Sequence, residues 1–547
     1  MLKICRTYLF LLSGFKQCII LQPNAHTSNK SLKTLYLIGS ALIYLKGPKF
    51  LIYVSGALSM WGDRMWHFAI SVFLIELYGH NLLLTGIFGL VVAGSVLLLG
   101  ALIGDWVDRN PRNKGENALC KCNYVFRVAL CAYCLWLVIA EHKHSCCYDI
   151  VVCYTVVIVL ADVANLASTA LTIAIQRDWI VVITGYNRGH LAGMNATMRR
   201  IDQVTNILAP LAVGQVMTLA SNVVGCGFIL GWNLVSLIVE FIFLSRVYRI
   251  VPALSVKPPP AFTRNKQNTS VPPSESTSLH LQEISRIPVC LHRLRGLLST
   301  CWEGWRAYYR QPVFLAGLGL AFLYTTVLGF DCITTGYAYT QGISGSLLSI
   351  LMGVSAVAGL LGTVLFTKLR KACGLVNTGV ISSVLHLVCL MLCLCSVFAP
   401  GSPMDLSILN MGNASDPLLP DRSSIHWTNN TVLFENAPAG TEPESYVSII
   451  LLFLGVITAR VGLWSFDLTV TQLLQETICE SERGVVNGVQ SSMNYLMDLL
   501  HFIMVISVPQ PQHFGILVII SILFIFTGHT MYFLYARKVK RKPRTNT

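Results

Sequence analysis

Apolar segments long enough to cross a bilayer recur along the whole chain, and they constrain its fold more than any other feature. A bilayer core of about 30 Å needs about 20 apolar residues in a helix. Of the 547 residues, 54% are hydrophobic and 12% charged, which is outside the usual balance of a soluble domain. We therefore predict an all-α polytopic membrane protein with 12 transmembrane helices in two six-helix bundles. The predicted spans are 50–78, 82–103, 125–140, 150–175, 201–220 and 223–245, then 313–341, 345–367, 375–398, 446–470, 485–508 and 513–536.

The charge of the loops between the predicted spans indicates which side of the membrane each loop faces. The net charge of +14 does not indicate a nucleic-acid partner, because the basic residues gather in short connections between apolar runs, as in cytoplasmic loops. The loop 399–445 is acidic by contrast and is predicted to be extracellular, with Asn413 and Asn429 in glycosylation sequons. Both termini are predicted to be cytoplasmic. The basic residues assigned to cytoplasmic loops are Arg109, Arg112, Lys114, Arg177, Arg188, Arg199 and Arg200.

The same patterns divide the chain into domains. Residues 1–48 form an N-terminal cytoplasmic extension whose apolar patches are too short to span. Residues 49–247 and 309–537 form the two bundles, and a basic cytoplasmic tail follows at 538–547. Between the bundles, 248–308 is rich in Pro, Ser and Thr and is predicted to be a disordered cytoplasmic linker. The 18 cysteines are scattered and predict no disulfide framework.

The seventh predicted span is interrupted by polar residues and glycines, Leu328-Gly329-Phe330-Asp331-Cys332-Ile333-Thr334-Thr335-Gly336-Tyr337. An ionisable group at membrane depth is costly unless it faces a cavity or a partner. Broken membrane helices often line a transporter's binding site, so we predict a broken seventh helix that lines a pathway. A tolerated glycine kink is the alternative.

Residues suited to metal binding occur in both halves. Asp63 and His67 lie four residues apart on one face of the first span, while Asp331, Cys332 and His501 lie in the second half. Carboxylate, imidazole and thiolate together favour a first-row transition metal over calcium or magnesium. Iron(II), cobalt(II) and zinc all fit. The alternative is that these side chains make structural contacts between helices. No nucleotide-binding loop, nucleophile elbow or zinc-protease motif appears, so we do not expect an enzyme.

Several specific stretches resemble the ferroportin family of the major facilitator superfamily. They are Trp61-Gly62-Asp63-Arg64-Met65-Trp66-His67, Gly104-Asp105-Trp106-Val107-Asp108, Gln176-Arg177-Asp178-Trp179, Gly329 to Gly336, Gly462-Leu463-Trp464-Ser465-Phe466-Asp467 and Asn494-Tyr495. The resemblance implies a plasma-membrane exporter of Fe²⁺ that is proton-coupled, works by alternating access and is inhibited by the peptide hormone hepcidin. Co²⁺ and Zn²⁺ are further candidate cargoes, Ca²⁺ is an activator and a monomer is expected. A carrier of another metal or of an organic solute, and a non-transporting receptor, stay open as alternatives.

The resemblance also implies roles for individual residues. Residues 115–150 match the family poorly, and Asn123 stands where the family has glutamine. The implied metal ligands are Asp63, His67, Cys332 and His501; the implied hepcidin contacts are Asp331, Cys332, Tyr495 and His501; the implied calcium ligands are Asp63, Asn123, Asn233 and Glu240; and the implied cytoplasmic gate is Asp108, Arg112, Asp178, Asp202 and Arg483, with Arg199 beside them.

Overall fold

We describe the fold from a computed structural model. It describes residues 45–77, 83–112, 147–185, 187–258, 289–329, 345–402, 446–508 and 513–541, with isolated residues between some of these ranges. Residues 1–44 of the N-terminal extension, the two sequons, Asn123, Asp331 and Cys332 lie outside the described residues.

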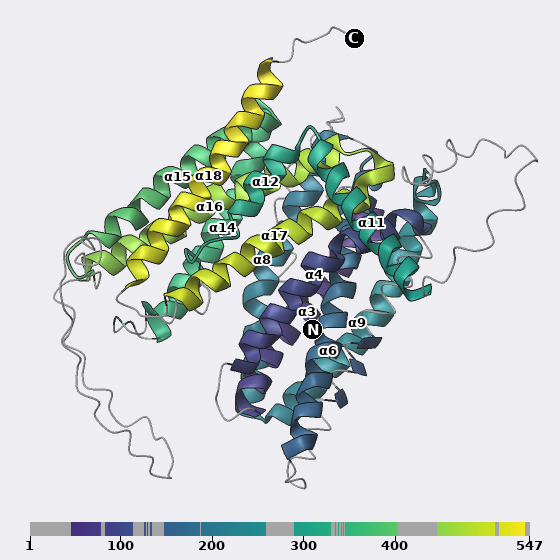
Figure 1. The fold of residues 1–547 in the computed structure, drawn as a ribbon, viewed down its shortest axis with the longest axis horizontal. Coiled ribbons are helices and arrows are strands. Elements are labelled where there is room, and N and C mark those ends of the chain that lie inside the picture. The colour runs from purple at the N-terminus through teal and green to yellow at the C-terminus, as the bar shows by residue number, and fades with distance from the viewer. Residues whose placement is uncertain are drawn as a thin grey trace, which may run out of the picture.

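The first half of the chain forms one helical bundle. Its elements are α3 (Pro48–Leu77), α4 (Leu83–Arg109), α6 (Cys147–Thr172), the π-helix η2 (Ile173–Trp179), α7 (Ile180–Ile183), α8 (Arg188–Leu219) and α9 (Asn222–Ile250), with the short 3-10 turn η3 (Pro252–Ser255) after it. These helices stand together in the lower right of Figure 1. A cluster around Met65, Trp66 and Ile229 forms part of their buried core.

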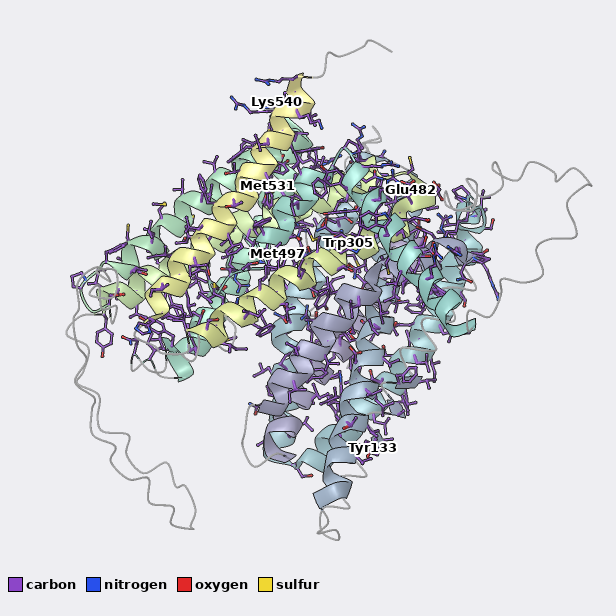
Figure 2. All side chains as sticks on the ribbon, in the orientation of Figure 1. Tyr133, Trp305, Glu482, Met497, Met531 and Lys540 are labelled. Carbon is purple, nitrogen blue, oxygen red and sulfur yellow. The ribbon has the colours of Figure 1, made fainter. Side chains whose placement is uncertain are left out.

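The second half forms the other bundle. Its elements are α11 (Val289–Arg310), α12 (Phe314–Phe322), α14 (Gly345–Cys373), α15 (Leu375–Val397), α16 (Val447–Thr477), the 3-10 turn η5 (Glu480–Glu482), α17 (Arg483–Ser507) and α18 (Phe514–Arg541). In Figure 1, α17 leaves this group and runs beside α4 of the first bundle. Side chains cover both groups of helices along their length in Figure 2.

The predicted all-helical membrane fold is confirmed. Within the described residues, seven helices are long and apolar enough to cross a membrane: Ile87–Arg109, Thr155–Ile183, Val223–Ile250, Ile350–Cys373, Leu375–Val397, Val447–Thr477 and Phe514–Arg541. Charged or polar side chains interrupt α3, α8 and α17, and these helices lie where three further spans were predicted. Of the predicted span 125–140, the structure describes only six residues.

Two predicted irregular segments differ from the structure. Residues 188–200 were assigned to a basic loop, but they form the first turns of α8, where Arg199 and Arg200 pair with groups of the second bundle. The predicted disordered linker contains η3 at its start and most of α11 at its end. Its average composition conceals α11, because the apolar side chains of that helix alternate with arginines at helical spacing.

The seventh span is broken as predicted. Helix α12 ends at Phe322, and irregular backbone follows within the described residues up to Gly329. Groups near the break find partners on neighbouring helices: Thr325 Oγ1 donates to the carbonyl of Met497 at 3.0 Å, and the Val327 amide donates to Ser521 Oγ at 3.0 Å. Irregular backbone survives at membrane depth because protein groups satisfy it in this way.

Candidate functional site

A buried group of charged side chains joins the two bundles at one end of the molecule. We call Asp108, Arg112, Asp178, Glu480 and Arg483 the gate cluster. Arg112 Nε donates to Asp178 Oδ2 at 2.6 Å, and Arg483 Nη1 donates to Asp178 Oδ1 at 2.9 Å. Arg112 also donates to Glu480. Asp178 is therefore the shared acceptor for one arginine from each half of the chain.

The electrostatics around Arg112 favour its charged form. Burial alone would lower the pKa of Arg112, but hydrogen bonds and charge from Asp178 and Glu480 outweigh it and raise that pKa above its ordinary value. Lys257 lies next to the cluster and donates to the backbone carbonyls of Val107 and Asn110, at 2.6 and 3.0 Å. Burial lowers the pKa of Lys257, and the nearby carboxylates oppose that effect only in part.

Asp108 acts on the other bundle through backbone groups. Its two carboxylate oxygens accept the amides of Gly484 and Val485, both at 2.8 Å. These amides belong to the first turn of α17, where helical N–H groups lack partners inside the helix and the helix dipole favours a negative charge. A carboxylate at the end of α4 therefore caps a helix of the opposite bundle.

Glycines bring α4 and α17 into backbone contact beside this cap. A Cβ built on Gly104 would lie 2.3 Å from the carbonyl oxygen of Gly484, and one on Gly488 would lie 2.1 Å from that of Gly100. Helices approach this closely only where side chains are absent. We call Gly100, Gly104, Gly484 and Gly488 the glycine seam.

The π-helix η2 presents the central acceptor of the gate cluster. A π-turn inserts an extra residue into a helix and often occurs at functional sites. Here the turn contains Gln176 and Asp178: the carbonyl of Gln176 accepts Gln475 Nε2 at 2.8 Å, while Asp178 accepts both arginines. Residues of η2 therefore face the second bundle at two points.

A second ion-pair layer lies around Asp202. Arg64 Nη2 donates to Asp202 Oδ1 at 2.8 Å, and Arg199 Nη1 pairs with Asp202 Oδ2 at 3.2 Å. Arg199 also pairs with Asp467 of α16 and lies 4.7 Å from the centroid of the Trp464 ring. Asp202 is thus separate from the gate cluster and joins the bundles through Arg199.

The predicted metal ligands of the first half lie on α3. Ser168 Oγ of α6 donates to Asp63 Oδ2 at 3.1 Å, and His67 lies one turn further along α3 on an exposed surface. In the second half, His501 is buried on α17 with its ring against Phe502. Within the part of the chain that the structure describes, no three His, Cys, Asp or Glu side chains come together as a metal cluster. The contribution of Cys332 lies outside that part.

Two of the predicted calcium ligands lie on α9. Trp232 stacks on Trp61 with ring centroids 5.5 Å apart, so this part of α9 packs against α3. Asn233 is completely buried, yet neither its Oδ1 nor its Nδ2 has a hydrogen-bond partner among the described residues. Glu240 lies two turns further on the same face, where Ser236 donates to its carboxylate. Buried amides are normally hydrogen-bonded, so Asn233 fits an oxygen ligand to a cation.

Tyr495, which sequence reasoning assigned to peptide binding, lies half-buried on α17. Sequence reasoning missed Glu480 and Lys257 as neighbours of the gate cluster. Glu480 lies three residues before Arg483, and that proximity was the available signal; nothing in the sequence marks Lys257.

The fold and site define a polytopic helical membrane transporter whose bundles meet through a buried ion-pair contact. The family model described as Ferroportin1 (FPN1) matches residues 46–525, so the chain belongs to the ferroportin family, which is a family of transporters and not of enzymes. Human "Ferroportin" is 54% identical over 91% of this chain and 93% of its own length. "Solute carrier family 40 member 1" of Danio rerio is 53% identical over 90% and 92%.

Solved structures show the same fold. The crystal structure of a bacterial homologue of the iron transporter ferroportin, in an outward-facing state, has a TM-score of 0.68 and 19% identity. The match covers 90% of this chain and 100% of the bacterial chain. At this level of identity the similarity establishes the architecture of the chain.

Proposed function

We propose that this protein exports Fe²⁺ from the cytosol to the extracellular side of the plasma membrane by alternating access. The observation that carries the proposal is the buried contact at one end, where Asp178 accepts hydrogen bonds from Arg112 and Arg483. Such a contact closes one side of a two-bundle carrier while the other side is open. The bacterial relative is described as a homologue of an iron transporter, and this description suggests iron as the cargo.

The closed end is the cytoplasmic one in this proposal. Arginines end α9 at Arg246 and Arg249, and the chain then returns to the gate cluster, where the carbonyl of Val256 accepts Arg112 Nη1 at 2.6 Å. Basic residues also end α18. Connections rich in Lys and Arg face the cytosol, and both termini are cytoplasmic in this proposal.

Iron(II) binds at two half-sites in this proposal, Asp63 with His67 and Cys332 with His501. Because the half-sites belong to different bundles, Asp63→Ala or His501→Ala should each weaken one and leave the other measurable by calorimetry. Complete loss of binding in either single variant would favour one shared site.

Reconstituted vesicles give the direct test of transport. Efflux should be measured for iron(II), cobalt(II), zinc and calcium under the same gradient. Iron(II) efflux that is lost in the double variant Asp63→Ala/His501→Ala supports the proposal. A folded wild-type protein that moves none of the transition metals would contradict it, and would favour an organic-solute carrier or a receptor.

Proton coupling is part of the same proposal. Metal binding requires a neutral imidazole, so protonation competes with the metal at His67 and His501. Acidifying the outside should favour release there. Efflux that does not change between about pH 6 and pH 8 would contradict a role for the two histidines as ligands.

Inhibition by hepcidin rests on Cys332 with Asp331, Tyr495 and His501 around it. A metal held by Cys332 and His501 leaves coordination positions that a peptide carboxylate can fill, and the coupling between metal and peptide must be reciprocal. Cobalt(II) should therefore tighten peptide binding in the wild type. In Cys332→Ser, which lacks the thiolate, most of that enhancement should disappear; equal enhancement in both proteins contradicts the assignment.

Calcium is proposed as an activator held by Asp63, Asn233 and Glu240, with Asn123 as the fourth residue. Carboxylate and amide oxygens are the ligands that calcium prefers. The specific support is the buried Asn233 side chain, which has no hydrogen-bond partner among the residues that the structure describes. Calcium, and not magnesium, should raise the melting temperature of the wild type, and Asn233→Ala should lose that response. A full response in the variant would exclude Asn233 as a ligand.

A further inference from the structure

Helix α11 lies across the contact between the two bundles near the gate cluster. Gly304 lies close to a helix of each bundle: a Cβ there would lie 3.3 Å from Ala101 of α4 and 3.6 Å from Val489 of α17. Cys301 Sγ lies 3.8 Å from the carbonyl oxygen of Leu98, and Tyr308 donates to Gln490 Oε1 at 2.8 Å. The inner face of α11 thus contacts α4 and α17 together, as Figure 1 shows.

The outer face of α11 is exposed and amphipathic. Trp302 is 71% exposed, Tyr309 70% and Leu298 62%. Exposed arginines accompany these residues. Across the helix the sequence contains four arginines and one acidic residue, Glu303. The exposed arginines of the described side chains are Arg295, Arg306 and Arg310.

Tryptophan, tyrosine and leucine beside arginine are the residues of helices that lie in the interfacial region of a bilayer. A surface with such an excess of positive charge complements anionic phospholipid headgroups. The helix also leads within four residues into the membrane helix α12, so it cannot lie far from the bilayer.

We propose that the outer face of α11 binds anionic phospholipid, and that this binding holds the α4–α17 contact closed. The helix completes its contacts to Ala101 and Val489 only while α4 and α17 lie together. A lipid surface that favours this position of α11 therefore favours the closed seam, since a ligand shifts an equilibrium by its differential affinity for the two states. This regulation goes beyond the proposed transport function and does not depend on which cargo is moved.

The test uses the full-length chain in nanodiscs of phosphatidylcholine, with and without phosphatidylserine. Hydrogen exchange of the Gly484 and Val485 amides reports closure, because both amides donate to Asp108 across the bundles. Phosphatidylserine should slow this exchange in the wild type. Each arginine near an anionic surface contributes about a factor of five in affinity for that surface. The double variant Arg306→Gln/Arg310→Gln should therefore reduce the effect of phosphatidylserine on the exchange rate by roughly 25-fold at most.

A matched variant separates this site from total charge. Arg537→Gln/Lys538→Gln removes the same charge from exposed positions on α18 and should keep the wild-type response. Brominated phosphatidylcholine should quench part of the tryptophan emission of the wild type. This quenched part should be absent in Trp302→Phe. An α11 variant that responds to phosphatidylserine like the wild type overturns the proposal. So does Trp302 emission that brominated lipid does not quench, because the outer face of α11 would then not lie in the bilayer.

Discussion

A single methyl group in the glycine seam should prevent the two bundles from closing. In Gly488→Ala the new Cβ would lie 2.1 Å from the carbonyl oxygen of Gly100, 2.9 Å from its carbonyl carbon and 3.2 Å from Gly104 Cα. All three are backbone atoms and cannot rotate away. To reach an ordinary contact distance of 3.4 Å from 2.1 Å, α4 and α17 must separate by about 1.3 Å.

The cost of that methyl group can be bounded. Overpacking a closely packed contact costs typically about 1–3 kcal/mol, which changes the ratio of closed to open molecules by about 5-fold to 150-fold. Alanine stabilises the helix itself relative to glycine by up to about 1 kcal/mol. Gly488→Ala should therefore leave α17 helical while weakening its contact with α4.

Hydrogen exchange at Gly484 and Val485 measures the effect, because these amides are protected by Asp108 of the opposite bundle. Their exchange should accelerate by the factor given above in Gly488→Ala. Gly94→Ala is the control on α4, since a Cβ at Gly94 meets nothing within 4 Å. Unchanged protection and transport in Gly488→Ala would refute the reasoning, as would an equal effect of Gly94→Ala.

Three further predictions concern the ion pairs and the broken helix. The Arg112 side chain is 1% exposed and pairs with Asp178, whereas that of Arg109 is 53% exposed and pairs with Asp105. Arg112→Gln should therefore destabilise the closed state by about 3–5 kcal/mol, and Arg109→Gln by at most about 1 kcal/mol. Equal exchange rates of the α17 amides in the two variants would contradict this. Asp178→Asn removes the acceptor that Arg112 and Arg483 share, so exchange of the same amides should accelerate; exchange that matches the wild type would contradict a central role for Asp178. Thr325→Val removes the hydroxyl that donates to the Met497 carbonyl, which should lower the melting temperature by an amount that corresponds to about 0.5–1.5 kcal/mol; no change in melting temperature would contradict a net contribution of this hydrogen bond.

The sequence predicted the parts of this protein that depend on local pattern. Apolar length set the membrane helices, and the polar residues and glycines after Phe322 predicted the break in the seventh span. The charged motifs around Asp108 and Asp178 pointed to a gate through resemblance to a family. Each of these signals lies within a short stretch, so no partner had to be known.

Residues 188–200 and α11 show where local pattern fails. Arg199 and Arg200 have the charge of a loop, yet they lie in a helix because Asp467 and Thr363 of the other bundle pair with them. The partners lie 268 and 163 residues away in the chain. The average composition of the linker likewise concealed α11, because the inner face of this helix packs against α4 and α17, which are distant in the sequence.

What the sequence alone determined is therefore the membrane class, the number and placement of most spans and the residue types available for metal binding and gating. Only the tertiary structure decided that Asp178 receives an arginine from each half, that Asp108 caps α17 and that Asn233 is buried with no hydrogen-bond partner in the described part of the chain. The physical reason is that hydropathy acts on each segment independently, whereas a hydrogen bond or ion pair at membrane depth requires two groups to meet. Which groups meet is fixed only when the two bundles pack together.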